Sequence, residues 1–171
     1  MEQGFVKVAS ATPRIRVADP VYNAQVICEQ AKEAAEHGAK IVVFPELCIT
    51  GYTCNDLFLQ ELLLEKAKEA LLTIAEETGQ LETLFLVGLP VDKDGRLYNV
   101  AAVLYRGRIL GMIPKKNIPM YAEFYEGRHF TPGEETVTEY RLGKQVIPFG
   151  SNLLFRCEEL PELILGCDLC E

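Results

Sequence analysis

Short apolar segments alternate with amphipathic helical segments in the first half of the chain, and this alternation constrains the fold more than any other feature. Residues 5–9 predict a first strand and residues 40–44 a second. The second is largely apolar without alternation, which is typical of a strand buried on both faces. Helical periodicity lies between these strands and again, roughly, over residues 56–78. We therefore expect an α/β fold.

The first helix has clear signals at both ends. Asp19 is expected to cap its N-terminus and Pro20 to occupy the first turn, while Gly38 marks its end. Each helix should bury one apolar stripe. The predicted stripes are Ala24, Ile27, Ala31, Ala34 and Ala35 in the first helix, and Leu63, Ala67, Ala70, Leu71, Ile74 and Ala75 in the second.

The remainder of the chain is rich in strands. Predicted strands cover residues 83–88, 97–105, 108–113, 146–149, 153–156 and 163–166. The first of these is expected to end at Pro90, and tight turns are expected at residues 94–95 and 106–107. A long loop over residues 115–133 carries several aromatic and charged side chains, and loops of this length are usually functional.

Composition excludes several classes of protein. The 171 residues suit one domain, and the net charge of −8 argues against nucleic acid as a partner. No stretch approaches the roughly 20 apolar residues of a membrane span, and the N-terminus does not resemble a signal peptide. Reduced thiols and a cytoplasmic location are therefore expected for the six cysteines. These are Cys28, Cys48, Cys54, Cys157, Cys167 and Cys170.

Three separated residues together suggest covalent attack on an amide or a nitrile. Glu46 and Cys170 each follow an apolar strand, and Lys115 follows another. A cysteine attacks as its thiolate, so a neighbouring base must take the proton, and Glu46 can serve as that base. The attack places negative charge on the carbonyl oxygen, which the ammonium of Lys115 can stabilise.

Other interpretations of these residues are weaker. Cys167 and Cys170 form a C-x-x-C pair, but a structural zinc site needs four ligands, so no metal is expected. Lys116 competes with Lys115 for the catalytic position, and the place directly after Pro114 favours Lys115. His129 is expected to pack or hydrogen-bond rather than to act as a base.

The chain resembles the nitrilase superfamily of carbon–nitrogen hydrolases through three motifs in the expected order. These are the segment 44–52 around Glu46, the segment 114–119 around Lys115, and Cys170 with the Glu that follows it. The resemblance implies a four-layer αββα sandwich, here incomplete at the C-terminus. It also implies a Glu-Lys-Cys triad in which Cys170 forms a thioester, with Glu126 helping to position the site.

The resemblance narrows to the glutamine-dependent NAD synthetases. Residues 51–58, 118–126 and 148–155 are similar to segments of that group. In it, an N-terminal glutaminase domain releases ammonia from glutamine, and a C-terminal domain uses ATP and that ammonia to amidate deamido-NAD. The resemblance implies that Tyr121 lines the glutamine pocket.

This resemblance implies that residues 1–171 form a partial glutaminase domain, with the synthetase domain absent. No glycine-rich phosphate loop occurs, so no cofactor is expected here, and ATP and deamido-NAD are expected to bind the missing domain. Glutamine and the synthetase domain are the expected partners, in a homo-oligomer, and weak or no activity is expected from these residues alone. Two alternatives stay open: a free-standing amidase for another small amide, and a fragment without catalysis.

Overall fold

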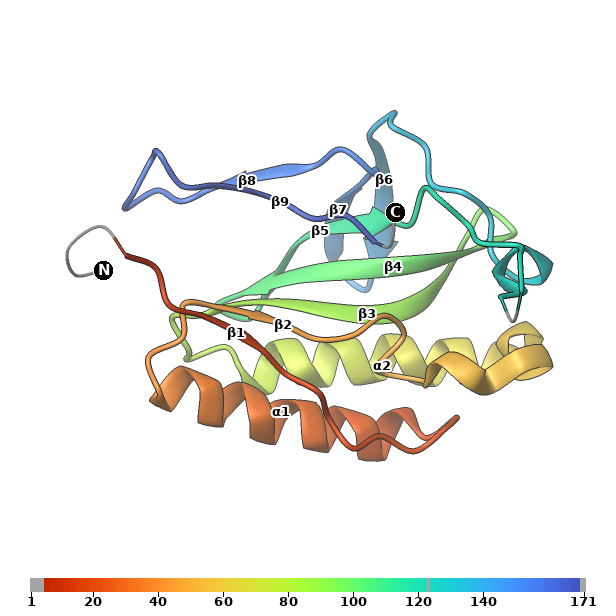
Figure 1. Ribbon diagram of the computed structural model, residues 1–171, viewed down its shortest axis with the longest axis horizontal. Coiled ribbons are helices and arrows are strands. Elements are labelled where there is room, and N and C mark those ends of the chain that lie inside the picture. Colours follow the sequence, from red (N-terminus) through yellow and green to blue (C-terminus); the bar gives the residue numbers. More distant parts are fainter. Residues whose placement is uncertain (1–4, 123, 170–171) are drawn as a thin grey trace.

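The fold is a layer of two helices against a large mixed sheet, with a short two-stranded ribbon over the opposite face of the sheet (Figure 1). The computed structural model describes residues 5–122 and 124–169. The helices are α1 (Pro20–Glu36) and α2 (Glu61–Glu77), with short 3-10 helices η1 (Tyr52–Leu59) and η2 (Glu126–Arg128). This confirms the predicted α/β class.

The large sheet has seven strands in the order β1-β2-β3-β4-β5-β7-β6. Its strands are β1 (Val8–Ser10), β2 (Ile41–Val43), β3 (Leu84–Lys93), β4 (Arg96–Tyr105), β5 (Arg108–Pro114), β6 (Thr138–Leu142) and β7 (Gln145–Phe149). The pairs β1–β2, β2–β3 and β5–β7 are parallel, and the other pairs are antiparallel. The ribbon pairs β8 (Leu154–Arg156) with β9 (Ile164–Gly166), antiparallel.

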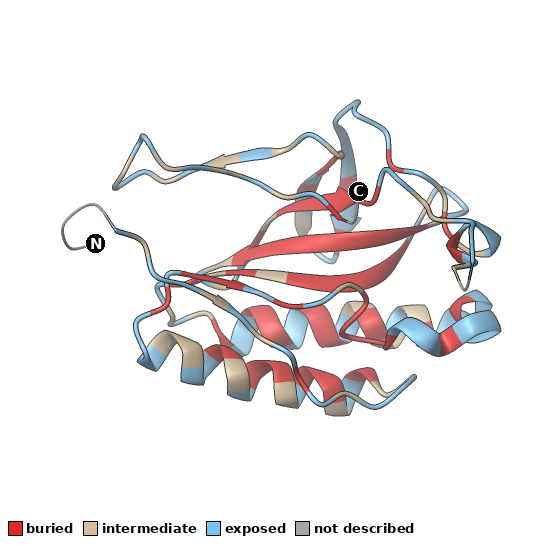
Figure 2. Cartoon of the chain, viewed as in Figure 1, coloured by how far each residue is buried: buried red, intermediate tan, exposed pale blue. Residues whose placement is uncertain are grey.

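The predicted helix signals and apolar stripes are largely confirmed. The Asp19 carboxylate accepts a hydrogen bond from the Tyr22 N–H, and Gly38 takes the left-handed conformation after the helix, at φ 81°. All six stripe residues of α2 are buried, as are the first three of α1. Figure 2 shows the burial concentrated where the helices meet the sheet.

The second helix begins later than predicted, at Glu61 rather than near Asp56. The preceding residues form η1, which is interrupted at Asn55 by a backbone with φ 49° and ψ −129°. A residue with these dihedral angles cannot be part of an α-helix, so the helix cannot extend through Asn55. The apolar periodicity of the sequence nevertheless continues on both sides of it.

Strand β3 does not end at Pro90 but continues to Lys93. The Leu84 N–H donates to the carbonyl of Lys40, and the Gly88 carbonyl accepts from the N–H of Ile49. The N–H and carbonyl groups of these alternate residues of β3 therefore point away from β4. Pro90 shares this parity, and β2 pairs only with residues 84–86 of β3. Its missing N–H therefore removes no hydrogen bond from the β3–β4 ladder.

The predictions for the first two strands, β1 and β2, were partly wrong. The first strand covers Val8–Ser10 instead of residues 5–9, because it pairs only with the three residues of β2. Strand β2 is not buried on both faces: Val42 is inaccessible, while Val43 is 44% exposed. Ile41, which shares a face of β2 with Val43, is 8% exposed, so the described residues cover that face only in part.

The hairpin turns and the later strands agree with the sequence, with one omission. Asp94 and Gly95 both have positive φ, as do Arg106 and Gly107, which matches the twist of the flanking strands. The predicted strands over residues 146–149, 153–156 and 163–166 correspond to β7, β8 and β9. Strand β6 was not predicted, because it alternates exposed polar with buried residues instead of forming an apolar run.

Candidate active site

Glu46 lies in a tight turn that follows β2 and crosses β3. A Cβ atom at Gly88 would lie 2.4 Å from the carbonyl oxygen of Pro45 and from the backbone nitrogen of Leu47. Only glycine fits such a close backbone approach, so Gly88 allows the turn to rest directly on the sheet. This contact places the Glu46 side chain on the sheet face opposite the helices.

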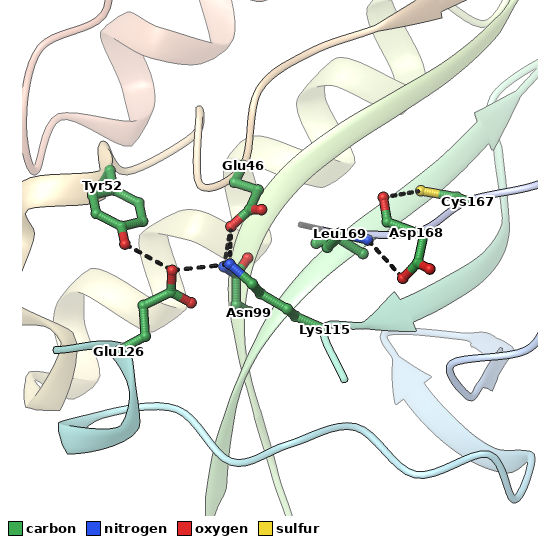
Figure 3. Close-up of polar contacts among 8 residues, drawn as sticks. All are labelled: Glu46, Tyr52, Asn99, Lys115, Glu126, Cys167, Asp168 and Leu169. Carbon is green, nitrogen blue, oxygen red and sulfur yellow. Dashed lines mark hydrogen bonds and ion pairs between the residues drawn. The ribbon is translucent and has the colours of Figure 1, made fainter. Parts of the chain in front are cut away.

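Lys115 follows β5 and is almost completely buried, with a side chain 2% exposed. Its backbone N–H donates to the carbonyl of Asn99 at 2.8 Å, which continues the β4–β5 pairing by one residue. Its ammonium donates to Glu46 Oε2 and to Glu126 Oε1, both at 2.9 Å (Figure 3). The structure therefore brings together Glu46 and Lys115, two of the three predicted catalytic residues, with the predicted supporting residue Glu126.

Glu126 comes from η2, within the long loop that sequence reasoning identified as functional. Its side chain is 5% exposed, and Oε1 also accepts a hydrogen bond from the Tyr52 hydroxyl at 2.7 Å. Oε2 is buried and has no hydrogen-bond partner among the described residues. A buried carboxylate requires compensation, and Lys115 provides its opposite charge.

Lys115 remains a cation at neutral pH. Burial is the largest single influence on its pKa and lowers it, but the hydrogen bonds and charges of Glu126 and Glu46 outweigh burial and raise the pKa above 10.5. The cluster therefore holds one ammonium between two carboxyl groups, and a permanent positive charge is available on this face of the sheet.

Sequence reasoning missed two residues of this cluster, Asn99 and the hydroxyl of Tyr52. Asn99 is completely buried in β4, and its Nδ2 donates to Glu46 Oε2 at 2.7 Å. A polar amide within the apolar run of β4 was the available signal for Asn99. Tyr52 was noted only as part of a motif, since its spacing gives no indication of a contact with Glu126, 74 residues away.

Cys170, the predicted nucleophile, lies outside the described residues. Leu169 before it is 5% exposed and packs against Ala101, Val103 and Ile113. Alternate residues of a strand share one face, so Ile113 is on the same side of the sheet as Lys115. The described chain thus reaches the face that carries the Glu46–Lys115–Glu126 cluster (Figure 3).

Two other predicted residues lie on the loop over residues 115–133. Tyr121, predicted to line the substrate pocket, is 67% exposed and packs edge-on against Phe124 with ring centroids 5.7 Å apart. The His129 ring packs against Phe58 at 5.9 Å and against Phe130 at 6.4 Å, and its Nε2 lies 3.9 Å from Asp56 Oδ1. The packing role predicted for His129 is therefore confirmed.

The cysteines within the described ranges are free, and most are poor nucleophiles. Burial raises the pKa of Cys28 to about 11 and of Cys48 to about 12, and it also raises the pKa of Cys54. Burial, followed by the charges of Asp168 and Glu46, raises the pKa of Cys167 to about 11. These four thiols therefore remain protonated at neutral pH. Cys157 is partly buried.

The length and apolar character of the helices can be compared with those of a membrane-spanning helix. Throughout residues 5–122 and 124–169, none of the helices combines the length and the apolar character that crossing a membrane requires.

Comparison with known proteins identifies relatives of this chain. The glutamine-dependent NAD(+) synthetase of Mycobacterium tuberculosis is 38% identical over 170 residues, which are 99% of this chain and 25% of that protein. The corresponding synthetase of Thermotoga maritima is 38% identical over 113 residues, which are 66% of this chain and 19% of that protein. This chain therefore spans a quarter or less of these relatives.

Solved structures show the same fold. A glutamine-dependent NAD(+) synthetase from Cytophaga hutchinsonii superposes with a TM-score of 0.84 at 28% identity, over 90% of this chain and 26% of that one. An amidase from Nesterenkonia superposes with a TM-score of 0.65 at 23% identity, over 84% of this chain and 56% of that one. The model of the carbon–nitrogen hydrolase family matches residues 7–154. The chain belongs to the carbon–nitrogen hydrolase family.

Proposed function

We propose that this chain is the glutaminase part of a glutamine-dependent NAD synthetase, in which Cys170 attacks the side-chain amide of glutamine. The observation that carries the proposal is the buried Lys115 ammonium held between Glu46 and Glu126, each at 2.9 Å. The 38% identity to synthetases of that name, across nearly the whole chain, supports glutamine as the substrate.

In the first step, Glu46 takes the proton of the Cys170 thiol as the sulfur attacks the amide carbon. A carbon–sulfur bond forms, and the carbonyl oxygen becomes an oxyanion beside the Lys115 ammonium. Glu46 then gives its proton to the amide nitrogen as the carbon–nitrogen bond breaks. Ammonia leaves, and the substrate remains bound to Cys170 as a thioester.

In the second step, a water molecule attacks the thioester while Glu46 accepts one of its protons. The carbon–sulfur bond breaks, the thiolate regains its proton from Glu46, and glutamate leaves. Lys115 keeps its charge throughout, because Glu126 and Glu46 raise its pKa. Glu126 acts as the supporting carboxylate that holds Lys115 in place.

Cys170 is a better candidate than the described thiols. The pKa of Cys28, Cys48, Cys54 and Cys167 is raised chiefly by burial. Leu169, the residue before Cys170, packs on the same sheet face as Lys115. Tyr121, on the loop that leads to Glu126, remains our candidate for contacting glutamine.

The same proposal assigns the use of ammonia to a part of the protein beyond these 171 residues. ATP and deamido-NAD would bind there, and the shares of 25% and 19% of the synthetase relatives leave room for such a part. Free cysteines among the described residues suit a cytoplasmic protein. Assembly into a homo-oligomer stays a prediction.

The proposal is tested in the full-length protein by comparing two nitrogen sources. The wild type should form NAD from deamido-NAD and ATP with either glutamine or ammonium chloride. Cys170→Ala should lose the glutamine-dependent reaction by at least about a thousandfold, because no thioester can form, and should keep the ammonium-dependent reaction. Cys48→Ala is the matched control and should keep both.

Two results would reject the proposal. If Cys170→Ala uses glutamine as well as the wild type does, Cys170 is not the nucleophile. If the wild type hydrolyses another small amide but neither glutamine nor deamido-NAD is consumed, the chain is a free-standing amidase.

A further inference from the structure

Asn99 is a fully buried amide in the middle of an otherwise apolar part of β4. Its side chain is inaccessible, and its neighbours Val100, Ala101 and Ala102 are buried as well. Burying an amide costs free energy unless its polar atoms find partners. Asn99 finds only some: Oδ1 is buried with no hydrogen-bond partner within the described part of the chain. A purely structural core position would be better filled by an apolar side chain.

Two hydrogen bonds of Asn99 lead to the candidate active site. Its Nδ2 donates to Glu46 Oε2 at 2.7 Å, and its backbone carbonyl accepts from the Lys115 N–H at 2.8 Å. One residue of β4 therefore contacts both Glu46 and Lys115. The orientation of the amide is defined, since its oxygen cannot face a carboxylate oxygen at this distance.

The two oxygens of Glu46 have different surroundings. Oε2 accepts from both Asn99 Nδ2 and Lys115 Nζ. No hydrogen bond to Oε1 is made by the residues that the structure describes, and the side chain is 26% exposed. Oε1 is thus the oxygen free to accept a proton from a reacting group.

We propose that Asn99 is a positioning residue that fixes the Glu46 carboxylate, so that Oε2 is held by Asn99 and Lys115 while Oε1 is left to accept a proton. The inference rests on the proposed role of Glu46 as the base. Asn99 itself touches no substrate. It acts by restricting the carboxylate to one rotamer and by stabilising its charged form with a neutral donor.

This role differs measurably from a structural one through the pH dependence of the reaction. The titratable groups facing Glu46 are Lys115, which contacts it directly, Glu126 beyond Lys115, and Cys167, whose pKa responds to the charge of Glu46. Replacing Asn99 changes none of these groups. A variant that loses only packing should keep the pH profile of the wild type, whereas loss of a hydrogen bond to the charged carboxylate should shift that profile.

The test uses Asn99→Leu in the full-length protein, a change that keeps the approximate size and removes the donor. We expect kcat for ammonia release from glutamine to fall by about tenfold or more with KM little changed, since the lost bond is to a charged group. The acid limb of the pH profile of Cys170 alkylation by iodoacetamide should move up by about one pH unit.

A matched control separates catalysis from folding. Thr83→Val removes another buried hydrogen bond, from the Thr83 hydroxyl to the Ala39 carbonyl at 2.8 Å, just before β3 begins at Leu84. It should lower the unfolding midpoint without moving the pH profile. If Asn99→Leu does not fold, Asn99→Ser carries the test, with the same direction and a smaller change because water can enter the space.

The outcomes are distinct from those of the proposed function. A folded Asn99 variant with the kcat and the alkylation profile of the wild type overturns the positioning role and leaves the glutaminase proposal intact. If the wild type releases no ammonia from glutamine, the glutaminase proposal fails, and the shift of the alkylation profile still decides the role of Asn99.

Discussion

Lys115 and Lys116 are neighbours in the sequence and both pair with glutamates, yet they occupy opposite environments. The Lys115 side chain is 2% exposed and contacts two carboxylates, Glu46 and Glu126. The Lys116 side chain is 53% exposed and pairs with Glu135, which is itself exposed. Strand β5 ends at Pro114, and the chain bends at Lys116, so the two lysines are not held on one face of the sheet.

The difference shows what burial does to the same pair of chemical groups. Water and salt screen the exposed pair, and holding two long side chains together offsets much of its attraction. The buried pair is poorly screened, and its members depend on each other because none can recover its hydration. Burial therefore converts an ordinary ion pair into a fixed charge that can act on a substrate.

The largest expected effect is that of Lys115→Met compared with Lys116→Met. The first removes the positive charge that pairs with both Glu46 and Glu126, and breaking a buried pair in this way costs about 3–5 kcal/mol of stability. It should also lower kcat by about a hundredfold or more, through loss of oxyanion stabilisation. Urea unfolding and ammonia release measure the two effects.

Lys116→Met should change neither quantity measurably. Equal loss of activity in both lysine variants would contradict the contrast between buried and exposed pairs, and would remove the reason for preferring Lys115.

The buried and exposed ion pairs can also be compared by replacing their glutamates, with Glu126→Gln for Lys115 and Glu135→Gln for Lys116. Glu126→Gln keeps the shape but removes one of the two negative charges on Lys115, and should lower kcat by about tenfold or more. Glu135→Gln should leave kcat unchanged, since its partner Lys116 lies on the surface. The measurement is steady-state ammonia release, and a Glu126→Gln enzyme with normal kcat would argue against a supporting role.

A smaller effect is expected for Tyr52→Phe. This change removes the hydroxyl that donates to Glu126 Oε1 at 2.7 Å and keeps the ring. We expect a loss of about 1 to 2 kcal/mol in transition-state stabilisation, seen as a drop in kcat of up to about thirtyfold. Tyr105→Phe is the control, because Tyr105 ends β4 at the side of the sheet away from the cluster. If both variants have the same kcat, the hydrogen bond from Tyr52 to Glu126 does not contribute to catalysis.

The smallest effect concerns pH. The pKa of Lys115 is raised above 10.5 by the two carboxylates despite its burial. A raised pKa means that the stabilisation is complete below the unfolded value of about 10.4 and is lost as the pH rises through the folded value. The difference in unfolding midpoint between the wild type and Lys115→Met should therefore stay constant from about pH 7 to 9 and shrink only above about 10.5. A difference that disappears near neutral pH would contradict this assignment.

The sequence predicted the framework well because periodicity and turn chemistry are local signals. The capping residue Asp19, the stripe of α2 and the turn at Asp94 were all confirmed. The break at Asn55 and the passage of β3 through Pro90 were missed. The break at Asn55 depends on the local dihedral angles, and the passage through Pro90 depends on β2 pairing only with residues 84–86 of β3. Neither is visible in the pattern of neighbouring residue types.

The site was predictable only in part for a related reason. Glu46, Lys115 and Glu126 could be selected because each stands at a strand end or in a loop with a recognisable motif. Asn99 and the Tyr52 hydroxyl belong to the site through contacts with residues 53 and 74 positions away, respectively. Such long-range pairs follow from sheet register and loop packing, so they emerge only once the chain is folded.

The most direct test of the central claim is the site of covalent labelling by a glutamine-mimicking electrophile, 6-diazo-5-oxo-norleucine, read by peptide mass spectrometry. A Cys157→Ser background removes a free, partly buried thiol that could compete for the reagent. The account predicts a single adduct on Cys170, prevented by excess glutamine and strongly slowed in Glu46→Gln. Labelling of Cys28, Cys48, Cys54 or Cys167 in preference to Cys170, or labelling that Glu46→Gln leaves unchanged, would contradict it.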